Sequence, residues 1–222
     1  MNSESVQAPA ALVAGVVIAG GRSVRFGGEK AAAGLVDRPL LMWAARRLQG
    51  SCTAVAVNAR PGTEAESIAR THGLPVLHDI PGDAAGPLAG VKAGLLWAKQ
   101  LGATALAVSP CDAPLLPDDL YDRLIQATGS GPAMAETSEG FQPLCSLWPV
   151  SALAAVTAAL IDGAHPPTWR LLDSLGATRV HFEAAAAFAN VNTRADLAAV
   201  AGKLAEEAYA RARGGVRPMP WR

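Results

Sequence analysis

The sequence predicts an α/β protein with three αβα layers, in which a mostly parallel, Rossmann-like sheet lies between two layers of helices. Apolar runs of strand length alternate four times with segments of helical periodicity over residues 12–127, which is the pattern of strands joined by crossover helices. Half of the 222 residues are apolar, enough to fill the core of one domain. We therefore expect a single domain over residues 1–222, with flexible ends at 1–9 and 214–222.

The first strand is expected at residues 12–19, where an apolar, valine-rich run has the character of a buried parallel strand. The loop after it combines glycines with cations: Gly20, Gly21, Gly27, Gly28, Arg22, Arg25 and Lys30. Loops at the carboxyl ends of parallel strands bind ligands in open α/β sheets. Glycines let backbone N–H groups approach phosphate oxygens closely, so this loop is predicted to bind a polyanion.

The common phosphate-binding motifs do not describe this loop. A Walker A motif needs Gly-Lys followed by Ser or Thr, whereas Glu29 precedes Lys30 and Ala31 follows it. The dinucleotide fingerprint G-x-G-x-x-G is also missing. An ordinary glycine-rich turn with solvated cations is the alternative, but the spacing of the paired glycines, Arg25 and Lys30 favours a nucleotide site.

The next elements continue the alternation. Pro39 stands where a helix can begin. The segments that follow are a strand at 54–57 ending at Asn58, a helix at 63–72, a strand at 75–77 before Asp79, a helix at 88–101, a strand at 103–109 and a helix at 117–127. The pair Asp118-Asp119 suits the N-terminal dipole of that last helix.

The final third is less regular. We expect strands at 133–136 and 144–148 around a turn at 137–142, helices at 151–161 and 168–175, a strand at 178–182 and a helix at 193–213. Thr193 is predicted to cap this last helix, with Asp196 at its third position. Asn190 and Asn192 either reach into the site or simply cap turns before the helix.

Polar groups stand at the ends of several predicted parallel strands. They are the glycine loop, Asn58, Asp79 and Asp112. Because the carboxyl ends of parallel strands share one edge of the sheet, these groups can converge on one ligand. Asp112 is the strongest candidate, since Pro110 and Pro114 hold it on a rigid turn. Taken singly, Asn58 and Asp79 are equally well explained as turn or capping residues.

Composition narrows the class of protein. Nineteen basic residues balance nineteen acidic ones, which argues against nucleic-acid binding. No apolar run approaches the roughly 18 residues of a membrane span, and the polar N-terminal segment is not a signal peptide. Cys52, Cys111 and Cys145 form no C-x-x-C pair, so neither a disulfide framework nor a zinc site is indicated. A cytoplasmic protein without membrane contact is expected.

The loop at residues 18–30, IAGGRSVRFGGEK, resembles the signature L-A-G-G-x-S-x-R-M-G-x-x-K of the molybdenum cofactor guanylyltransferase family, with Ile18 and Phe26 as conservative departures. Four later segments are similar to the family's remaining motifs in order: Asp79 with Gly86-Pro87-Leu88-Ala89-Gly90, Pro110-Cys111-Asp112-Ala113-Pro114, Gln142-Pro143, and Asn190-Val191-Asn192-Thr193 with Asp196-Leu197. Some relatives have His at the position of Gln142, which leaves its role open.

The resemblance implies a nucleotidyltransferase with a nucleotide-diphospho-sugar transferase-like fold. It implies that GMP passes from GTP to the terminal phosphate of molybdenum-bearing molybdopterin, with release of pyrophosphate. It also implies Mg²⁺ as cofactor, held by Asp112. The implied nucleotide contacts are Ile18, Ala19, Gly20, Gly21, Lys30, Asn58, Asp79 and Asp112. Proteins of molybdoenzyme maturation are possible partners, and a monomer or weak homo-oligomer is expected.

These residue types suit the implied chemistry. The attacking phosphate is already an anion, so catalysis consists of positioning and charge stabilisation. Arg25, Lys30 and Asp112 are the predicted catalytic residues: the cations neutralise the triphosphate and the carboxylate binds the metal. The Asp79 carboxylate can accept from the N1–H and amino group of guanine. The alternatives are a cytidylyltransferase of the same fold, a sugar-nucleotide pyrophosphorylase, which the later motifs disfavour, and a non-catalytic carrier of nucleotide or cofactor.

Overall fold

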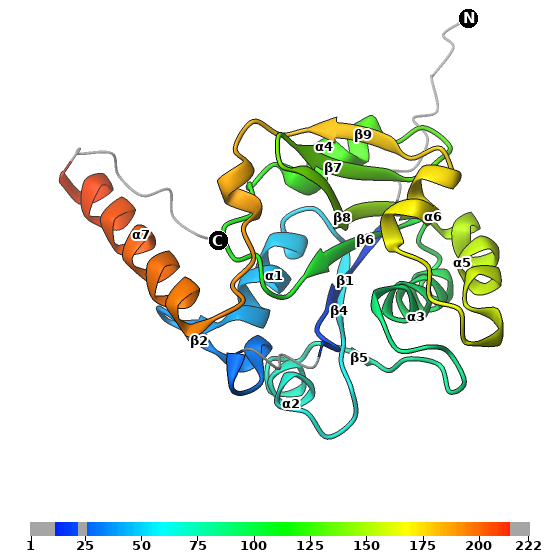
Figure 1. The fold of residues 1–222 in the computed structure, drawn as a ribbon, viewed down its shortest axis with the longest axis horizontal. Coiled ribbons are helices and arrows are strands. Elements are labelled where there is room, and N and C mark those ends of the chain that lie inside the picture. The colour runs from blue at the N-terminus through cyan, green and yellow to red at the C-terminus, as the bar shows by residue number, and fades with distance from the viewer. Residues whose placement is uncertain (1–11, 22–25, 214–222) are drawn as a thin grey trace, which may run out of the picture.

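The protein is built on a seven-stranded sheet with the strand order β5-β4-β1-β6-β8-β7-β9 (Figure 1). The computed structural model describes residues 12–21 and 26–213, so the predicted flexible ends and Arg22 and Arg25 lie outside the described residues. The strands are β1 (Val13–Ile18), β4 (Ala54–Asn58), β5 (Val76–Leu77), β6 (Ala105–Pro110), β7 (Ala133–Thr137), β8 (Gly140–Pro149) and β9 (Thr178–His181). A separate two-stranded hairpin, β2 (Gly34–Leu35) with β3 (Arg38–Pro39), was not predicted.

The sheet has a parallel and a mixed half. Strands β5, β4, β1 and β6 run parallel to one another. Strand β8 is antiparallel to both β6 and β7, and β9 is parallel to β7. The carboxyl ends of these parallel strands therefore share one edge of the sheet, where Asn58, Asp79 and Asp112 were expected to converge.

Helices cover both faces of the sheet (Figure 1). They are α1 (Leu40–Gln49), α2 (Glu64–Thr71), α3 (Pro87–Gln100), α4 (Leu120–Ala127), α5 (Leu153–Ala159), α6 (Thr168–Ser174) and α7 (Arg194–Arg213). Side chains alternate between the two cores along β1: Val13 and Val17 pack with α1, α2 and α4, whereas Ala14 and Val16 pack with α3, α5 and α6. The predicted three-layer α/β fold is confirmed.

The C-terminal helix α7 begins with the predicted capping box. The Thr193 hydroxyl accepts a hydrogen bond from the backbone N–H of Asp196 at 3.1 Å. The Asp196 carboxylate accepts from the backbone N–H groups of Asn192 and Thr193 at 2.9 and 2.8 Å. Leu197 and Val200 of α7 then pack beside Phe26 and the β2–β3 hairpin.

Most boundaries lie within one or two residues of the prediction, and those of α4, β8 and α5 show how the structure departs from it. Helix α4 begins at Leu120 rather than at residue 117, because residues 118–119 form a turn, from which Asp118 pairs with Arg47 of α1. Strand β8 begins at Gly140, inside the segment predicted as a turn, because residues 140–142 pair with β7. The helix predicted at 151–161 is shorter, with 3₁₀ turns at Val150–Ala152 and Ile161–Gly163 on either side of α5.

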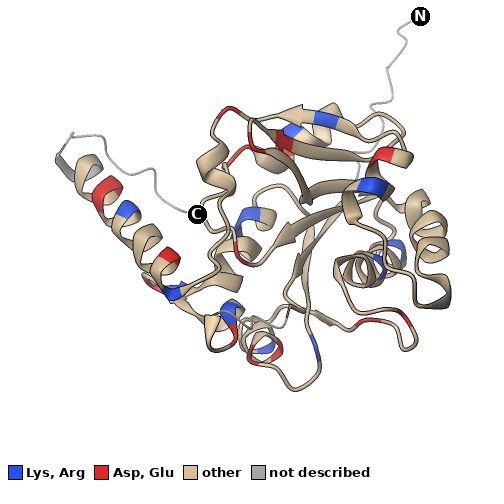
Figure 2. Ribbon diagram, viewed as in Figure 1, with Lys and Arg blue, Asp and Glu red and all other residues tan. Residues whose placement is uncertain are grey.

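Surface charge is mixed in sign over the elements in view, and α7 carries both kinds (Figure 2). All three cysteines are free thiols. Within residues 12–21 and 26–213, no helix has the length and apolar character of a membrane span.

Candidate functional site

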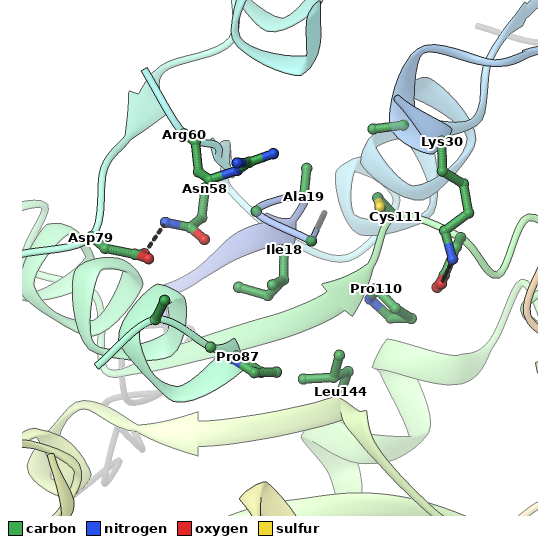
Figure 3. Close-up of a pocket in the computed structure, with 16 residues that line it drawn as sticks. Ile18, Ala19, Lys30, Asn58, Arg60, Asp79, Pro87, Pro110, Cys111 and Leu144 are labelled. Carbon is green, nitrogen blue, oxygen red and sulfur yellow. Dashed lines mark hydrogen bonds and ion pairs between the residues drawn. The ribbon is translucent and has the colours of Figure 1, made fainter. Parts of the chain in front are cut away.

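A cavity of about 240 Å³ opens at the carboxyl ends of the parallel strands (Figure 3). All of the predicted nucleotide contacts line it: Ile18, Ala19, Gly20, Gly21, Lys30, Asn58, Asp79 and Asp112. The structure thus brings together residues up to 94 positions apart, from Ile18 to Asp112. Their role as ligand contacts stays a prediction, and Arg25 lies outside the described residues.

One end of the cavity is formed by Asn58 and Asp79. Asn58 ends β4 with only 3% of its surface exposed, and its amide donates to Asp79 Oδ1 at 2.9 Å and to the Leu77 carbonyl at 3.3 Å. Because the Asn58 amide group fixes one carboxylate oxygen, the carboxylate is held in a defined position at the cavity wall.

Helix α3 approaches this pair so closely that it needs a glycine there. A Cβ atom on Gly90 would lie 2.4 Å from Asn58 Oδ1 and 2.9 Å from Ile18 Cδ1. Glycine at position 90 is therefore explained by packing, because any larger residue would collide with the Asn58 side chain.

The other end of the cavity is formed by Lys30 and Asp112. The Lys30 ammonium lies 2.5 Å from Asp112 Oδ2 and donates to Asn192 Oδ1 at 3.1 Å. Both side chains of the ion pair are mostly buried, with 14% and 18% exposed. The contact joins the glycine loop, the end of β6 and the segment before α7, which come from three distant parts of the chain.

The turn that carries Asp112 is held from the C-terminal side. The backbone N–H of Val191 donates to the Asp112 carbonyl at 2.8 Å. The Asn192 side chain accepts from Lys30, and its backbone N–H donates to the Asp196 carboxylate in the capping box of α7. Whether Asn190 or Asn192 contacts a ligand stays a prediction. Burial, followed by the nearby Asp112 carboxylate, raises the pKa of the Cys111 thiol to about 12, so this thiol is not a nucleophile at neutral pH.

Glu29, which breaks the Walker A pattern, has a structural partner at the start of α2. Its carboxylate accepts from the backbone N–H of Glu64 at 2.7 Å and of Ala65 at 2.9 Å. These groups belong to the first turn of α2, so Glu29 caps that helix and anchors the segment just before Lys30.

A second cavity, of about 290 Å³, lies on the other side of Asp112. It shares Pro110, Asp112 and Leu144 with the first. Its other walls come from the turn after β6, from β8 and from the segment before α7: Ala113, Phe141, Gln142, Pro143, Cys145, Phe188 and Asn190. Asp112 therefore stands between two spaces of similar size.

Several lining residues were not predicted. Arg60, Cys111 and Leu144 line the first cavity, and Phe141 and Phe188 line the second. Arg60 stands two positions after the end of β4, so the rule that picked out Asn58 also applies to it. The two phenylalanines carry no such signal, because apolar residues in a strand or a turn predict core packing.

The sequence of residues 15–180 matches the family model described as MobA-like NTP transferase domain. The chain belongs to this family. A molybdenum cofactor guanylyltransferase of Cereibacter sphaeroides is 39% identical over 195 residues, covering 87% of this chain and 98% of that relative. One of Rhodobacter capsulatus is 37% identical over 204 residues, covering 88% and 98%. The resemblance drawn from the five sequence motifs is confirmed.

Solved structures with the same fold include other MobA-like proteins and nucleotidyltransferases. Molybdopterin-guanine dinucleotide biosynthesis protein A from Archaeoglobus fulgidus has a TM-score of 0.67 at 19% identity, covering 87% of this chain and 99% of that chain. A nucleotidyl transferase from Methanothermobacter thermautotroptrophicus has a TM-score of 0.71 at 18% identity, covering 89% and 100%. At these identities the likeness shows the fold, which agrees with the nucleotide-diphospho-sugar transferase-like fold expected from the motifs.

Proposed function

We propose that this MobA-like protein transfers GMP from GTP to the terminal phosphate of molybdenum-bearing molybdopterin, forming the guanine dinucleotide cofactor and releasing pyrophosphate. The observation that carries the proposal is the position of Asp112 between two cavities. A transferase must bring a donor and an acceptor to one point, whereas a carrier needs one binding site. Relatives named molybdenum cofactor guanylyltransferase supply the identities of the two substrates.

GTP occupies the first cavity in this proposal. Guanine lies at the end formed by Asn58 and Asp79, where the carboxylate accepts from its N1–H and amino group. Adenine lacks this pair of donors, which accounts for a preference for guanine. The backbone at Ile18, Ala19, Gly20 and Gly21 follows the ribose and phosphates to the Lys30 end.

The chain's own residues supply positioning and charge. Lys30 stabilises the negative charge that develops on the departing pyrophosphate. To do so it shifts from its contact with Asp112 toward the phosphates, while Asn192 continues to orient its ammonium group. Arg25 is expected to assist from the glycine loop. No side chain has to remove a proton, because the attacking phosphate is already ionised.

The donor groups at Asp112 fit Mg²⁺. This ion prefers oxygen ligands and commonly takes one or two carboxylates, with phosphates and water completing its shell. Asp112 offers a carboxylate oxygen at the point where the cavities meet. Within the described part of the chain no group of three acidic, histidine or cysteine side chains gathers as a closed metal site, so the phosphates of GTP would complete the shell. When bound, the ion neutralises charge on the transferring phosphate.

Molybdopterin occupies the second cavity in this proposal. Phe141, which is partly exposed, and Phe188, which is buried against Phe182, give this cavity an apolar wall for a flat pterin. Gln142 and Asn190 offer amide groups to its polar edge. The terminal phosphate then lies toward Asp112, opposite the leaving pyrophosphate.

The test is pyrophosphate release by the purified chain with molybdopterin and Mg²⁺, measured with GTP, CTP, ATP and UTP in turn. We expect turnover with GTP, dependence on molybdopterin and loss on addition of a chelator. Equal turnover with CTP would move the assignment to a cytidylyltransferase. Tight GTP binding without turnover in any mixture would favour a carrier.

A further inference from the structure

We infer that Arg60 binds the triphosphate of the nucleotide in the first cavity. This inference rests on the proposed function and names a contact that neither the motifs nor the relatives assign. Arg60 lines the cavity together with Lys30, Asp79 and Asp112. Figure 3 shows its side chain directed away from Asp79 and toward the Ala19 side of the cavity, which is the side where the phosphates of a nucleotide bound at Asp79 must run.

Hydrogen bonds hold the backbone around Arg60 and so fix the point at the cavity wall from which its side chain extends. The N–H of Ala59 donates to the Leu77 carbonyl at 3.1 Å, which continues the β4–β5 ladder by one residue. The Thr63 hydroxyl donates to the Arg60 carbonyl at 2.7 Å and closes the turn before α2. Arg60 therefore leaves the strand end next to Asn58 on a short, hydrogen-bonded connection.

Charge balance in the cavity points to an anionic ligand for this side chain. The charged side chains among the described lining residues are two cations, Lys30 and Arg60, and two carboxylates, Asp79 and Asp112. Lys30 is 2.5 Å from Asp112, so its charge is compensated at that end. In the described part of the chain Arg60 forms no ion pair. The phosphates of a nucleoside triphosphate would supply negative charge for its guanidinium group.

The N-terminus of α2 does not provide a binding site for phosphate. Helix α2 begins four positions after Arg60, but the N–H groups of its first turn at Glu64 and Ala65 already bind the Glu29 carboxylate. A helix N-terminus that is occupied by a carboxylate is not available to a phosphate. Arg60 is thus the group on this wall that can donate several hydrogen bonds to phosphate oxygens.

The experiment measures binding of GTP and of guanosine to the full chain by calorimetry. Arg60→Gln is expected to weaken GTP binding about 10-fold or more, the effect of losing a charge-assisted contact, and to change guanosine binding by less than about twofold. Arg60→Lys should recover part of the loss because it keeps the charge. The gap between wild type and Arg60→Gln should narrow with added salt.

The matched control is Arg70→Gln, ten positions further along. Arg70 pairs with Glu66 on the exposed face of α2 and does not line the cavity, so both ligands should bind as to wild type. Equal loss of GTP and guanosine binding in Arg60→Gln, or no loss of either, would overturn the inference. If the wild-type chain binds GTP and only the Arg60 prediction fails, the proposed function stands. If the wild-type chain does not bind GTP, the proposed function itself is refuted.

Discussion

The two cavities on either side of Asp112 are built by different means. The first is formed at the ends of parallel strands, where Asn58 and Asp79 hold each other in a fixed hydrogen bond. The second is formed by antiparallel β8 and by the segment before α7, and its walls include the rings of Phe141 and Phe188. The comparison teaches that a parallel edge places oriented polar groups around one cavity, while the antiparallel strand and the segment before α7 build a separate cavity with apolar walls.

The largest effect is expected for Asp112, because this residue lines both cavities. Asp112→Ala removes the carboxylate proposed to bind the metal and one of the partners of the Lys30 ammonium. We expect turnover to fall by about 1,000-fold or more, with far-UV circular dichroism unchanged. Asp119→Ala, on the exposed turn before α4, is the control and should retain activity. Unchanged turnover in Asp112→Ala would refute the metal assignment.

Lys30→Ala should affect the donor side alone. Loss of an ammonium that contacts phosphate is expected to weaken GTP binding by about 10- to 100-fold, while guanosine binding stays near the wild-type value. Calorimetry with the two ligands separates the effects. A control is Lys99→Ala, in the last turn of α3. Equal losses for GTP and guanosine would show that Lys30 does not contact the phosphates.

Gly90→Ala tests the base end of the donor cavity. The new Cβ would lie 2.4 Å from Asn58 Oδ1, so Asn58 must move away from Asp79. We expect about tenfold weaker binding of both GTP and guanosine, with a loss of about 1–3 kcal/mol in unfolding free energy from overpacking. In Gly50→Ala the nearest contact is an ordinary 3.5 Å, and binding should be preserved. Normal guanosine affinity in Gly90→Ala would contradict the role of Asn58.

Phe141→Ala should affect the acceptor side alone. Its ring lines the second cavity and packs 4.6 Å from the Arg179 guanidinium. Loss of a stacking surface is expected to raise KM for molybdopterin about tenfold, while the Kd for GTP changes by less than about twofold. Leu101→Ala, an exposed side chain after α3, is the control. A larger effect on GTP than on molybdopterin would place the acceptor elsewhere.

The smallest effect is expected for the capping box of α7. Hydrogen bonds from the backbone N–H groups of Asn192 and Thr193 hold the pKa of Asp196 below its ordinary value. A carboxyl group with a lowered folded-state pKa stabilises the protein above its unfolded pKa of about 3.9, and this contribution disappears as pH falls through the folded value. Asp196→Ala should therefore lower Tm at neutral pH.

The acid dependence of the same variant provides its own control. The difference in Tm between wild type and Asp196→Ala should shrink at pH values below the folded-state pKa, where the wild-type carboxyl group is protonated. A difference that is the same at acid and neutral pH would show that the charge of Asp196 does not stabilise the helix.

The parallel half of the fold could be predicted because each strand and its ligand-facing end lie together in the sequence. Asn58 and Asp112 were found by that rule, and they line the predicted edge. The antiparallel half was less predictable. Gly140, Gln142 and Pro143 have the composition of a turn, yet Gln142 pairs with Ala135, and the register then shifts between Met134 and Ala135. Pro143 falls within that irregular stretch, where a missing N–H is tolerated.

Contacts between the ends of the chain were beyond local reasoning. Asn192 lies 162 positions from Lys30, and the pattern of asparagines before α7 is equally consistent with capping. The hydrogen bonds between Glu29 and α2 could not be predicted either, because a glutamate beside a loop lysine is ordinarily a solvated charge. Both contacts depend on how separate elements pack, which periodicity and strand-end rules do not report.

The hydrogen bond from Val191 to Asp112 has a consequence for biosynthesis. Translation delivers all four parallel strands long before it delivers residues 190–192, so a ribosome-bound chain can assemble its sheet while the Lys30 end still lacks its last support. We therefore expect the contacts of Asp112 and Lys30 with this segment to form only after residues 190–192 have been synthesised.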